Sequence, residues 1–258
     1  MIMPHRCRVR RAAAASAGGG GGGGGGAIVN AVNFDGTNDY LTRGASLTGA
    51  VDGKEVTVSY WMKVAADGPT LTVLNNPTAS ASVLASRNGN NKAIVQFNTS
   101  AGGIAWYIVP TQTTKIVDGW VHVLASGSTA TSVSSMYIDD VLVVPSDSGM
   151  VADALIDFTK SEWFVGAAVT TASKFNGDLA ELWFDDVFID LSVVANRRKF
   201  ITSTLKPVNL GSDGSTPTGT APLIYLSGDT ATWHTNKGTG GGFTENGALT
   251  TAATSPSD

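Results

Sequence analysis

Hydrophobic and polar residues alternate along much of the chain with a period of two, which is typical of a β-strand that buries one face. The clearest case is residues 56–63, where apolar Val56, Val58, Tyr60 and Met62 alternate with Thr57, Ser59, Trp61 and Lys63. Similar segments between turn-forming residues predict strands at 28–34, 82–86, 92–98, 104–109, 119–126, 132–138, 141–144, 162–166, 222–226 and 243–249. The pattern therefore predicts an all-β protein.

One segment, residues 179–189, is apolar on both parities. One parity holds Ala180, Leu182, Phe184 and Phe188, and the other holds Leu179, Trp183, Val187 and Ile189. A strand that is buried on both faces lies in the middle of a sheet. We therefore expect a central strand here, with a bend or turn at Asp185 and Asp186.

The pattern predicts one short helix near residues 192–201. Ser192 is a good N-cap, and no Gly or Pro follows before position 202. Arg197, Arg198 and Lys199 fall in the second half of this segment, where positive charge opposes the helix dipole.

Composition divides the chain at residue 27. Residues 1–26 hold a basic stretch, four alanines and an unbroken run of nine glycines, which predicts a flexible leader. This leader is either a tether to a larger assembly or a segment without a function of its own. Residues 27–258 are expected to form one sandwich that includes a Gly/Thr/Ser-rich C-terminal extension from Lys206.

Charge and cysteine content narrow the class of protein. The four arginines of the leader leave 13 basic residues against 21 acidic ones, so the rest of the chain carries a net charge of −8. This acidic body argues against nucleic-acid binding through the folded domain. Cys7 is the only cysteine, so no intrachain disulfide can form. No apolar run is long enough to span a membrane, and we expect no signal peptide.

Five segments in a fixed order resemble the concanavalin A-like lectin/glucanase superfamily, specifically its laminin-G-like jelly rolls. They are AVNFDGTNDYL (31–41), VTVSYWMKV (56–64), GWVHVLAS (119–126), SMYIDDVLVV (135–144) and GDLAELWFDDVFIDLS (177–192). The resemblance covers residues 28–201 and implies a two-sheet antiparallel jelly-roll sandwich. The stretches 206–229 and 236–249 are similar to a version found in proteins of tailed bacteriophages and prophages.

The superfamily includes glycoside hydrolases, which the resemblance makes a candidate class. Their branch carries an ExDxxE motif on one strand, and retaining hydrolysis needs two carboxyl groups about 5–5.5 Å apart. Here the nearest match is Glu181 with Asp185 and Asp186, and Trp183 stands where the second carboxylate belongs. We therefore expect no enzyme and no catalytic residue, with Glu181 a single polar group at a strand edge or cleft.

Three aromatic residues are candidate platforms for a sugar: Trp106, Tyr107 and Trp233. Trp106 and Tyr107 are adjacent, so in a strand they point to opposite faces, and Trp233 lies in a Gly/Thr-rich segment. A core position is the alternative for each tryptophan.

Calcium is the one metal that the resemblance suggests. Asp35, Asn38 and Asp39 are the candidate ligands, because calcium takes six to eight oxygen ligands and relatives bind it through loop Asp and Asn. The alternative is that these residues only form a turn.

The sequence therefore suggests a non-enzymatic jelly-roll module on a phage particle, as a head decoration or tail fibre, made in the bacterial cytoplasm. It would present loops for adhesion. Its expected partners are other virion proteins and a cell-surface glycan, and we expect a homo-oligomer. Two alternatives remain: a purely structural capsid or tail decoration protein that binds no sugar, and a carbohydrate-active enzyme of the same superfamily.

Overall fold

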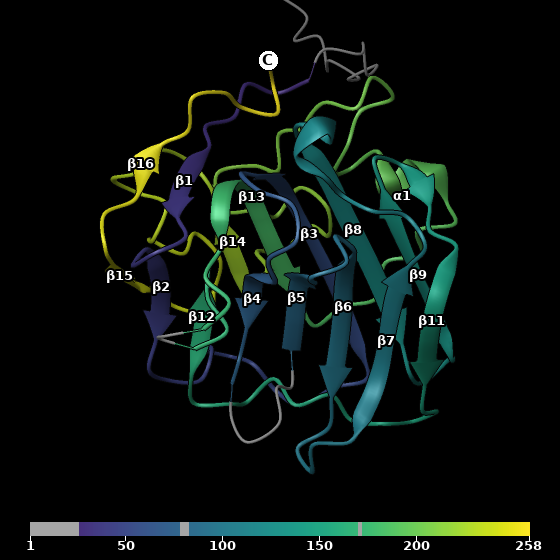
Figure 1. Ribbon diagram of the computed structural model, residues 1–258. Helices are drawn as coiled ribbons and strands as arrows, with labels where there is room; N and C mark the ends of the chain where they lie inside the picture. Colours follow the sequence, from purple (N-terminus) through teal and green to yellow (C-terminus); the bar gives the residue numbers. More distant parts are fainter. Residues whose placement is uncertain (1–25, 78–82, 170–171) are drawn as a thin grey trace, which may run out of the picture.

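The computed structural model describes residues 26–77, 83–169 and 172–258. The predicted leader therefore lies outside the described residues, apart from Gly26. Two antiparallel β-sheets of eight strands each face one another across a shared apolar core (Figure 1). This architecture confirms the predicted two-sheet antiparallel jelly-roll sandwich.

The first sheet contains the long strands at the centre of the molecule. Its strands are, in spatial order, β10 (Val141–Leu142), β9 (Val133–Ile138), β8 (Val121–Ser128), β3 (Glu55–Val64), β13 (Asn176–Asp185), β1 (Val32–Asp35) and β16 (Thr250–Thr251). The eighth strand, β14 (Ile224–Leu226), also pairs with β13.

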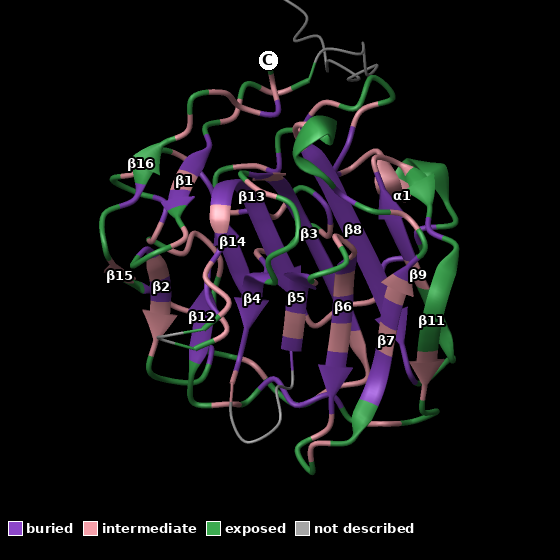
Figure 2. Cartoon of the chain, viewed as in Figure 1, coloured by how far each residue is buried: buried purple, intermediate pink, exposed green. Residues whose placement is uncertain are grey.

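The second sheet lies against the first. Its strands are, in spatial order, β11 (Pro145–Met150), β7 (Ile104–Pro110), β6 (Ala93–Asn98), β5 (Val83–Arg87), β4 (Leu71–Asn75), β12 (Trp163–Val165), β2 (Tyr40–Arg43) and β15 (Thr244–Asn246). Figure 2 shows that β3, β8 and β13 are buried along most of their length, whereas β11 at the edge is largely exposed.

The predicted alternation in β3 is confirmed. Its even-numbered apolar side chains all belong to the core between the sheets: Val56, Val58, Tyr60, Met62 and Val64. Trp61, of the opposite parity, packs instead in a small cluster with Ala180 on the outer face of the first sheet. This outer face is therefore covered by protein as well.

The short helix forms inside the predicted range, but its N-cap differs from the prediction. Helix α1 spans Val194–Arg197 and its N-cap is Val193. The Ser192 hydroxyl lies outside the helix and donates to the Asp190 carboxylate at 2.6 Å. Asn196 Nδ2 donates to the Asp190 carbonyl at 2.9 Å. The turn around Asp190 therefore uses the hydroxyl that a cap would need. A single turn of 3-10 helix, η1 (Ile116–Asp118), precedes β8.

Strand β13 is central, as predicted, but its two faces are not those that simple alternation predicts. The register with β3 shifts between Ala180 and Trp183, which is a β-bulge. As a result Leu179 and Leu182 both face the core between the sheets, and Ala180 and Trp183 both belong to the outer clusters. The extra residue reverses the parity in the middle of the strand.

The bulge also marks a change of neighbour along one edge of β13. Residues 176–179 pair with β1, and residues 182–184 pair with β14. Glu181 lies between the two paired stretches and has a left-handed backbone, with φ of 50°. The sheet is therefore interrupted beside β13 at this residue.

The core imposes a testable constraint at Gly127 of β8. A Cβ at this position would lie 2.6 Å from the fully buried Trp106 ring. We expect Gly127→Ala to lower the free energy of unfolding by about 1–3 kcal/mol, because an overpacked core must shift. Urea denaturation measures this, with Gly44→Ala as the control, because nothing lies within 4 Å of a Cβ there. Equal stability of both variants would contradict this packing.

Candidate functional site

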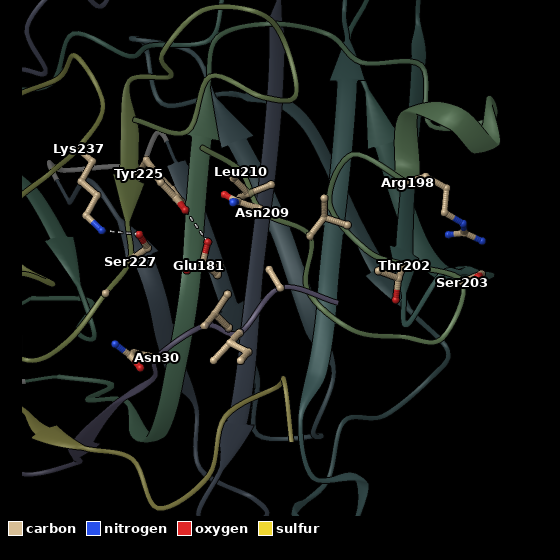
Figure 3. A pocket seen from close by; sticks show the side chains of 15 residues that line it. Asn30, Glu181, Arg198, Thr202, Ser203, Asn209, Leu210, Tyr225, Ser227 and Lys237 are labelled. Atoms are coloured by element: carbon tan, nitrogen blue, oxygen red, sulfur yellow. Dashed lines mark hydrogen bonds between the residues drawn. The ribbon is translucent and has the colours of Figure 1, made fainter. Parts of the chain in front are cut away.

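A pocket of about 880 Å³ opens on the outer face of the first sheet, where β13 changes neighbours (Figure 3). Glu181 of β13 and Tyr225 of β14 supply one part of its lining, and a segment before β1 supplies another. The lining residues are Ala27, Ile28, Val29, Asn30, Glu181, Arg198, Thr202, Ser203, Val208, Asn209, Leu210, Tyr225, Ser227, Gly228 and Lys237.

Glu181 is the buried acid of this pocket, and only 5% of its surface is exposed. Its Oε2 atom accepts a hydrogen bond from the Tyr225 hydroxyl at 2.6 Å. No described residue donates a hydrogen bond to the other carboxyl oxygen, Oε1. Burial raises the pKa of Glu181 to about 7, although the Tyr225 hydrogen bond and the charge of Lys237 favour the ionised form.

Lys237 is the cation whose charge acts on the Glu181 carboxyl and favours its ionised form. Its Nζ donates to the Ser227 hydroxyl at 2.8 Å and lies 5.8 Å from the centre of the Tyr225 ring. Figure 3 shows Lys237, Ser227, Tyr225 and Glu181 together at one side of the pocket. No described carboxylate forms an ion pair with this ammonium group, so two of its three N–H groups are left for other acceptors.

Arg198 lies at the other side of the pocket, away from Glu181 (Figure 3). Asp140 accepts a hydrogen bond from Arg198 Nη2 and one from Arg197 Nε, both at 2.6 Å. These two arginines lower the pKa of Asp140 despite its partial burial. Arg198 therefore shares a carboxylate partner with Arg197, whereas Lys237 has no carboxylate partner among the described residues.

The structure corrects the predicted sugar platform at Trp106 and Trp233. Both indoles are fully buried. Trp106 stacks on Phe97 with ring centres 4.7 Å apart, and Trp233 packs edge-on against Phe34 at 5.8 Å. Neither ring is accessible to a ligand, because both side chains are part of the core between the sheets.

Tyr107 is only partly buried, on the opposite side of β7 from Trp106, as the alternation predicts. Its hydroxyl donates to the exposed Asp147 carboxylate at 2.8 Å. The three aromatic candidates are therefore not brought together, and Tyr107 alone reaches the surface.

The calcium candidates form a turn in which the carboxylates of Asp35 and Asp39 accept backbone hydrogen bonds. Oδ1 of Asp35 accepts the backbone N–H groups of residues 37, 38 and 39 at 2.7, 3.0 and 3.2 Å. The buried Asp39 accepts from the backbone of Asp35 at 3.1 Å and of Ala248 at 2.9 Å. Asn38 is exposed between them. This geometry favours the turn-forming alternative.

Two features are absent from the part of the chain that the structure describes. There, no three His, Cys, Asp or Glu side chains are grouped so that they could hold a metal ion. No helix within the same residues has the length and apolar character needed to cross a membrane.

The architecture is that of a two-sheet antiparallel jelly-roll sandwich. Residues 35–188 match the family model of laminin-G-like domains, described as concanavalin A-like lectin/glucanases superfamily. The match covers more than half of the chain, and the chain belongs to this family. A search of curated proteins finds no match.

Two solved structures show the same fold. A Bacteroides ovatus protein described as carbohydrate-binding is 14% identical, with a TM-score of 0.63 over 88% of this chain. The present chain covers 61% of that protein's length. A heptameric SAP-like pentraxin from Limulus polyphemus is 13% identical, with a TM-score of 0.52 over 87% of this chain and 94% of its own. Such low identities show the fold alone.

Sequence reasoning expected Glu181 at an edge or cleft, but it missed the residues around it. Tyr225, Ser227, Lys237 and Asn209 come from the C-terminal extension, which lies beyond the matched family region. The signal that could have found them is the apolar run 222–226 beside a lysine in an otherwise Gly/Thr-rich segment.

Glu181 should leave a measurable trace in the pH dependence of stability. Its pKa is 4.5 in the reference state and about 7 in the fold, so its contribution is complete below pH 4.5 and is lost as the pH rises through 7. We expect the free energy of unfolding of the wild type, minus that of Glu181→Gln, to fall by roughly 3 kcal/mol between pH 4 and pH 8.

Urea denaturation of the wild type and of Glu181→Gln across this pH range measures the difference. The contributions of the other titrating groups are the same in both proteins and cancel. Tyr225→Phe removes a hydrogen bond that favours the carboxylate, so it should move the change to still higher pH. A difference that is independent of pH would mean that Glu181 is solvated like a surface acid.

Proposed function

We propose that this protein is a non-enzymatic carbohydrate-binding module that holds a saccharide in the Glu181 pocket, and that it serves adhesion on a tailed-phage particle. The observation that carries the proposal is the buried, left-handed Glu181, whose carboxyl lines the pocket with one oxygen unpaired. Backbone strain of this kind is costly and clusters at binding sites, and the unpaired oxygen is an acceptor that a ligand can use.

The pocket has the size and composition of a small-ligand site. Its volume of about 880 Å³ lies within the range of roughly 300–1,000 Å³ for such sites. Aliphatic side chains such as Val29, Val208 and Leu210 can cover the C–H face of a sugar ring. Asn209, Ser203 and Thr202 add amide and hydroxyl groups for its hydroxyls.

The recognition mechanism follows from this lining. Tyr225 is almost completely buried and its hydroxyl is bound to Glu181, so no aromatic ring is free for a sugar to stack on in the pocket. Hydrogen bonds from a recessed site would instead orient the ligand. Affinity per copy would be modest, and display of many copies on a particle would raise the avidity.

One carboxyl does not make a hydrolase site. Glu181 is the only acid that lines the pocket among the described residues. Asp185, four positions further along β13, accepts the N–H of Leu223 at 3.0 Å and is buried separately. Four strand residues span about 13 Å, which exceeds both carboxyl separations used by glycosidases. This supports the non-enzymatic reading.

The phage context rests on the sequence. The stretches 206–229 and 236–249 resemble those of tailed-phage and prophage proteins, and the glycine-rich leader and single cysteine suit a virion protein folded in a bacterial cytoplasm. The proposed partners are the neighbouring capsid or tail proteins and a glycan on the host surface, with the module present as a homo-oligomer.

A second candidate, a decoration protein that binds no sugar, is favoured by one surface feature. The edge strand β10 and the residue two positions beyond it expose Val141, Leu142 and Val144 by 60%, 54% and 63%. Exposed aliphatic side chains on an unpaired strand edge are typical of a contact with another subunit.

Saccharide binding should depend on the pocket and not on Tyr107. We expect a glycan array and calorimetry to detect binding by the wild type and a loss of at least tenfold for Asn209→Trp, whose indole would fill space beside Glu181. Tyr107→Ala is the control and should bind normally. Binding that survives Asn209→Trp and disappears with Tyr107→Ala would move the site to the second sheet.

The virion assignment is tested separately by electron microscopy of host-derived phage particles with gold-labelled antibody to residues 27–258. We expect label on the capsid or tail. Unlabelled particles with free protein in the medium would contradict the phage context and leave the pocket argument unaffected. Labelled particles combined with no saccharide binding would favour the decoration protein.

A further inference from the structure

Two ionisable groups of the pocket, Glu181 and Lys237, lack a complete set of partners. Glu181 Oε1 receives no hydrogen bond from the described residues, and Lys237 Nζ has Ser227 as its one hydrogen-bond partner there. Arg198, the third charged group of the lining, is bound to Asp140. A ligand therefore meets one free acceptor and one cation with free N–H groups.

These two groups lie close enough to affect each other. Tyr225 links them, because its hydroxyl donates to Glu181 Oε2 and its ring lies 5.8 Å from Lys237 Nζ. Figure 3 shows both side chains on the same side of the pocket, together with Tyr225 and Ser227. The charge of Lys237 also acts on the Glu181 carboxyl and favours its ionised form.

The opposite charges argue against a charged ligand at this point. An anionic group drawn to Lys237 would also face the Glu181 carboxylate, and an ammonium group drawn to Glu181 would face Lys237. A neutral pair of adjacent hydroxyls meets both requirements, because a hydroxyl is both donor and acceptor. One hydroxyl can donate to Oε1 while its neighbour accepts from Nζ.

We infer that Glu181 and Lys237 are the specificity-determining residues of the pocket and that they select a neutral sugar through a vicinal diol. This inference rests on the proposed function and gives it a ligand class. The carboxylate contact is the stronger determinant, because hydrogen bonds to a buried charge are worth more than those between neutral groups.

The test uses the full chain at pH 8 and small probes of known structure. Calorimetry or ligand-observed NMR would compare methyl α-glycosides of mannose, galactose and glucose with their 2-deoxy, 3-deoxy and 4-deoxy forms, with galacturonate and with glucosamine. We expect a neutral glycoside to bind best. Removal of either hydroxyl of one adjacent pair should weaken its binding about tenfold or more. This part needs no variant and so does not depend on how a variant folds.

Glu181→Gln then assigns the contact. The glutamine keeps the shape of the side chain, and its carbonyl oxygen can still accept from Tyr225, which turns an N–H donor toward the ligand in place of the acceptor. Relative to the wild type, we expect Glu181→Gln to bind the parent sugar about tenfold or more weakly. For the deoxy sugar that lacks the donating hydroxyl, the variant and the wild type should bind with nearly equal affinity. Lys237→Met should show the same pattern for the neighbouring hydroxyl.

Two results would overturn the inference in distinguishable ways. Stronger binding of galacturonate than of any neutral glycoside, increased by Glu181→Gln, would refute the diol and leave carbohydrate binding intact. Equal effects of the variants on parent and deoxy sugars would also refute it. No binding of any saccharide, here and on the glycan array, would instead remove the proposed function itself.

Discussion

A β-bulge at Glu181 governs the layout of one whole side of this protein. It adds one residue to the central strand β13, so Leu179 and Leu182 both reach the core between the sheets. The same extra residue turns the Glu181 side chain out of the core and separates the stretch that pairs with β1 from the stretch that pairs with β14. A left-handed non-glycine residue costs about 1–2 kcal/mol, which the packing on both faces must offset.

The outer face of the first sheet shows how that packing is achieved. Trp183 joins a second apolar cluster that includes Phe200, Leu210 and Tyr225, and its indole N–H donates to the Gly214 carbonyl at 2.9 Å. The C-terminal extension therefore covers β13, and its own strands join both sheets. The pocket lies between this cover and the bulge, so strands β13 and β14 supply part of its lining and loops supply most of the rest.

The sequence predicts most strands because they alternate or are bounded by turn residues, as in β3. It misses β4, where all five residues are buried and no alternation exists, and β11, which is polar and largely exposed. Both strands form because of the neighbours they pair with, which local pattern does not reveal. The predicted assignment of β13 side chains to the two faces of the sheet is wrong for a related reason. Nothing in residues 181–184 (ELWF) indicates from sequence alone that a bulge forms there.

The candidate site is predictable only in part. His122 is a buried residue of β8: its Nε2 contacts Ser59 Oγ at 2.9 Å, and burial lowers its pKa to about 3. The prediction that Trp233 is an exposed sugar platform is wrong, because its Gly/Thr-rich segment folds back and its ring packs edge-on against Phe34 in the core. The partners of Glu181 lie 44 and 56 positions further along the chain, at Tyr225 and Lys237, so only the fold brings them together.

We propose that the bulge creates a ligand site beside Glu181. Backbone amide NMR of the isotopically labelled chain, titrated with methyl α-mannoside, methyl α-galactoside and methyl α-glucoside in turn, tests it at residue level. We expect at least one sugar to shift resonances of residues 202–210, 225–228 and 237, together with Glu181. Shifts confined to β6, β7 and β11 around Tyr107 would contradict it and assign binding to the second sheet.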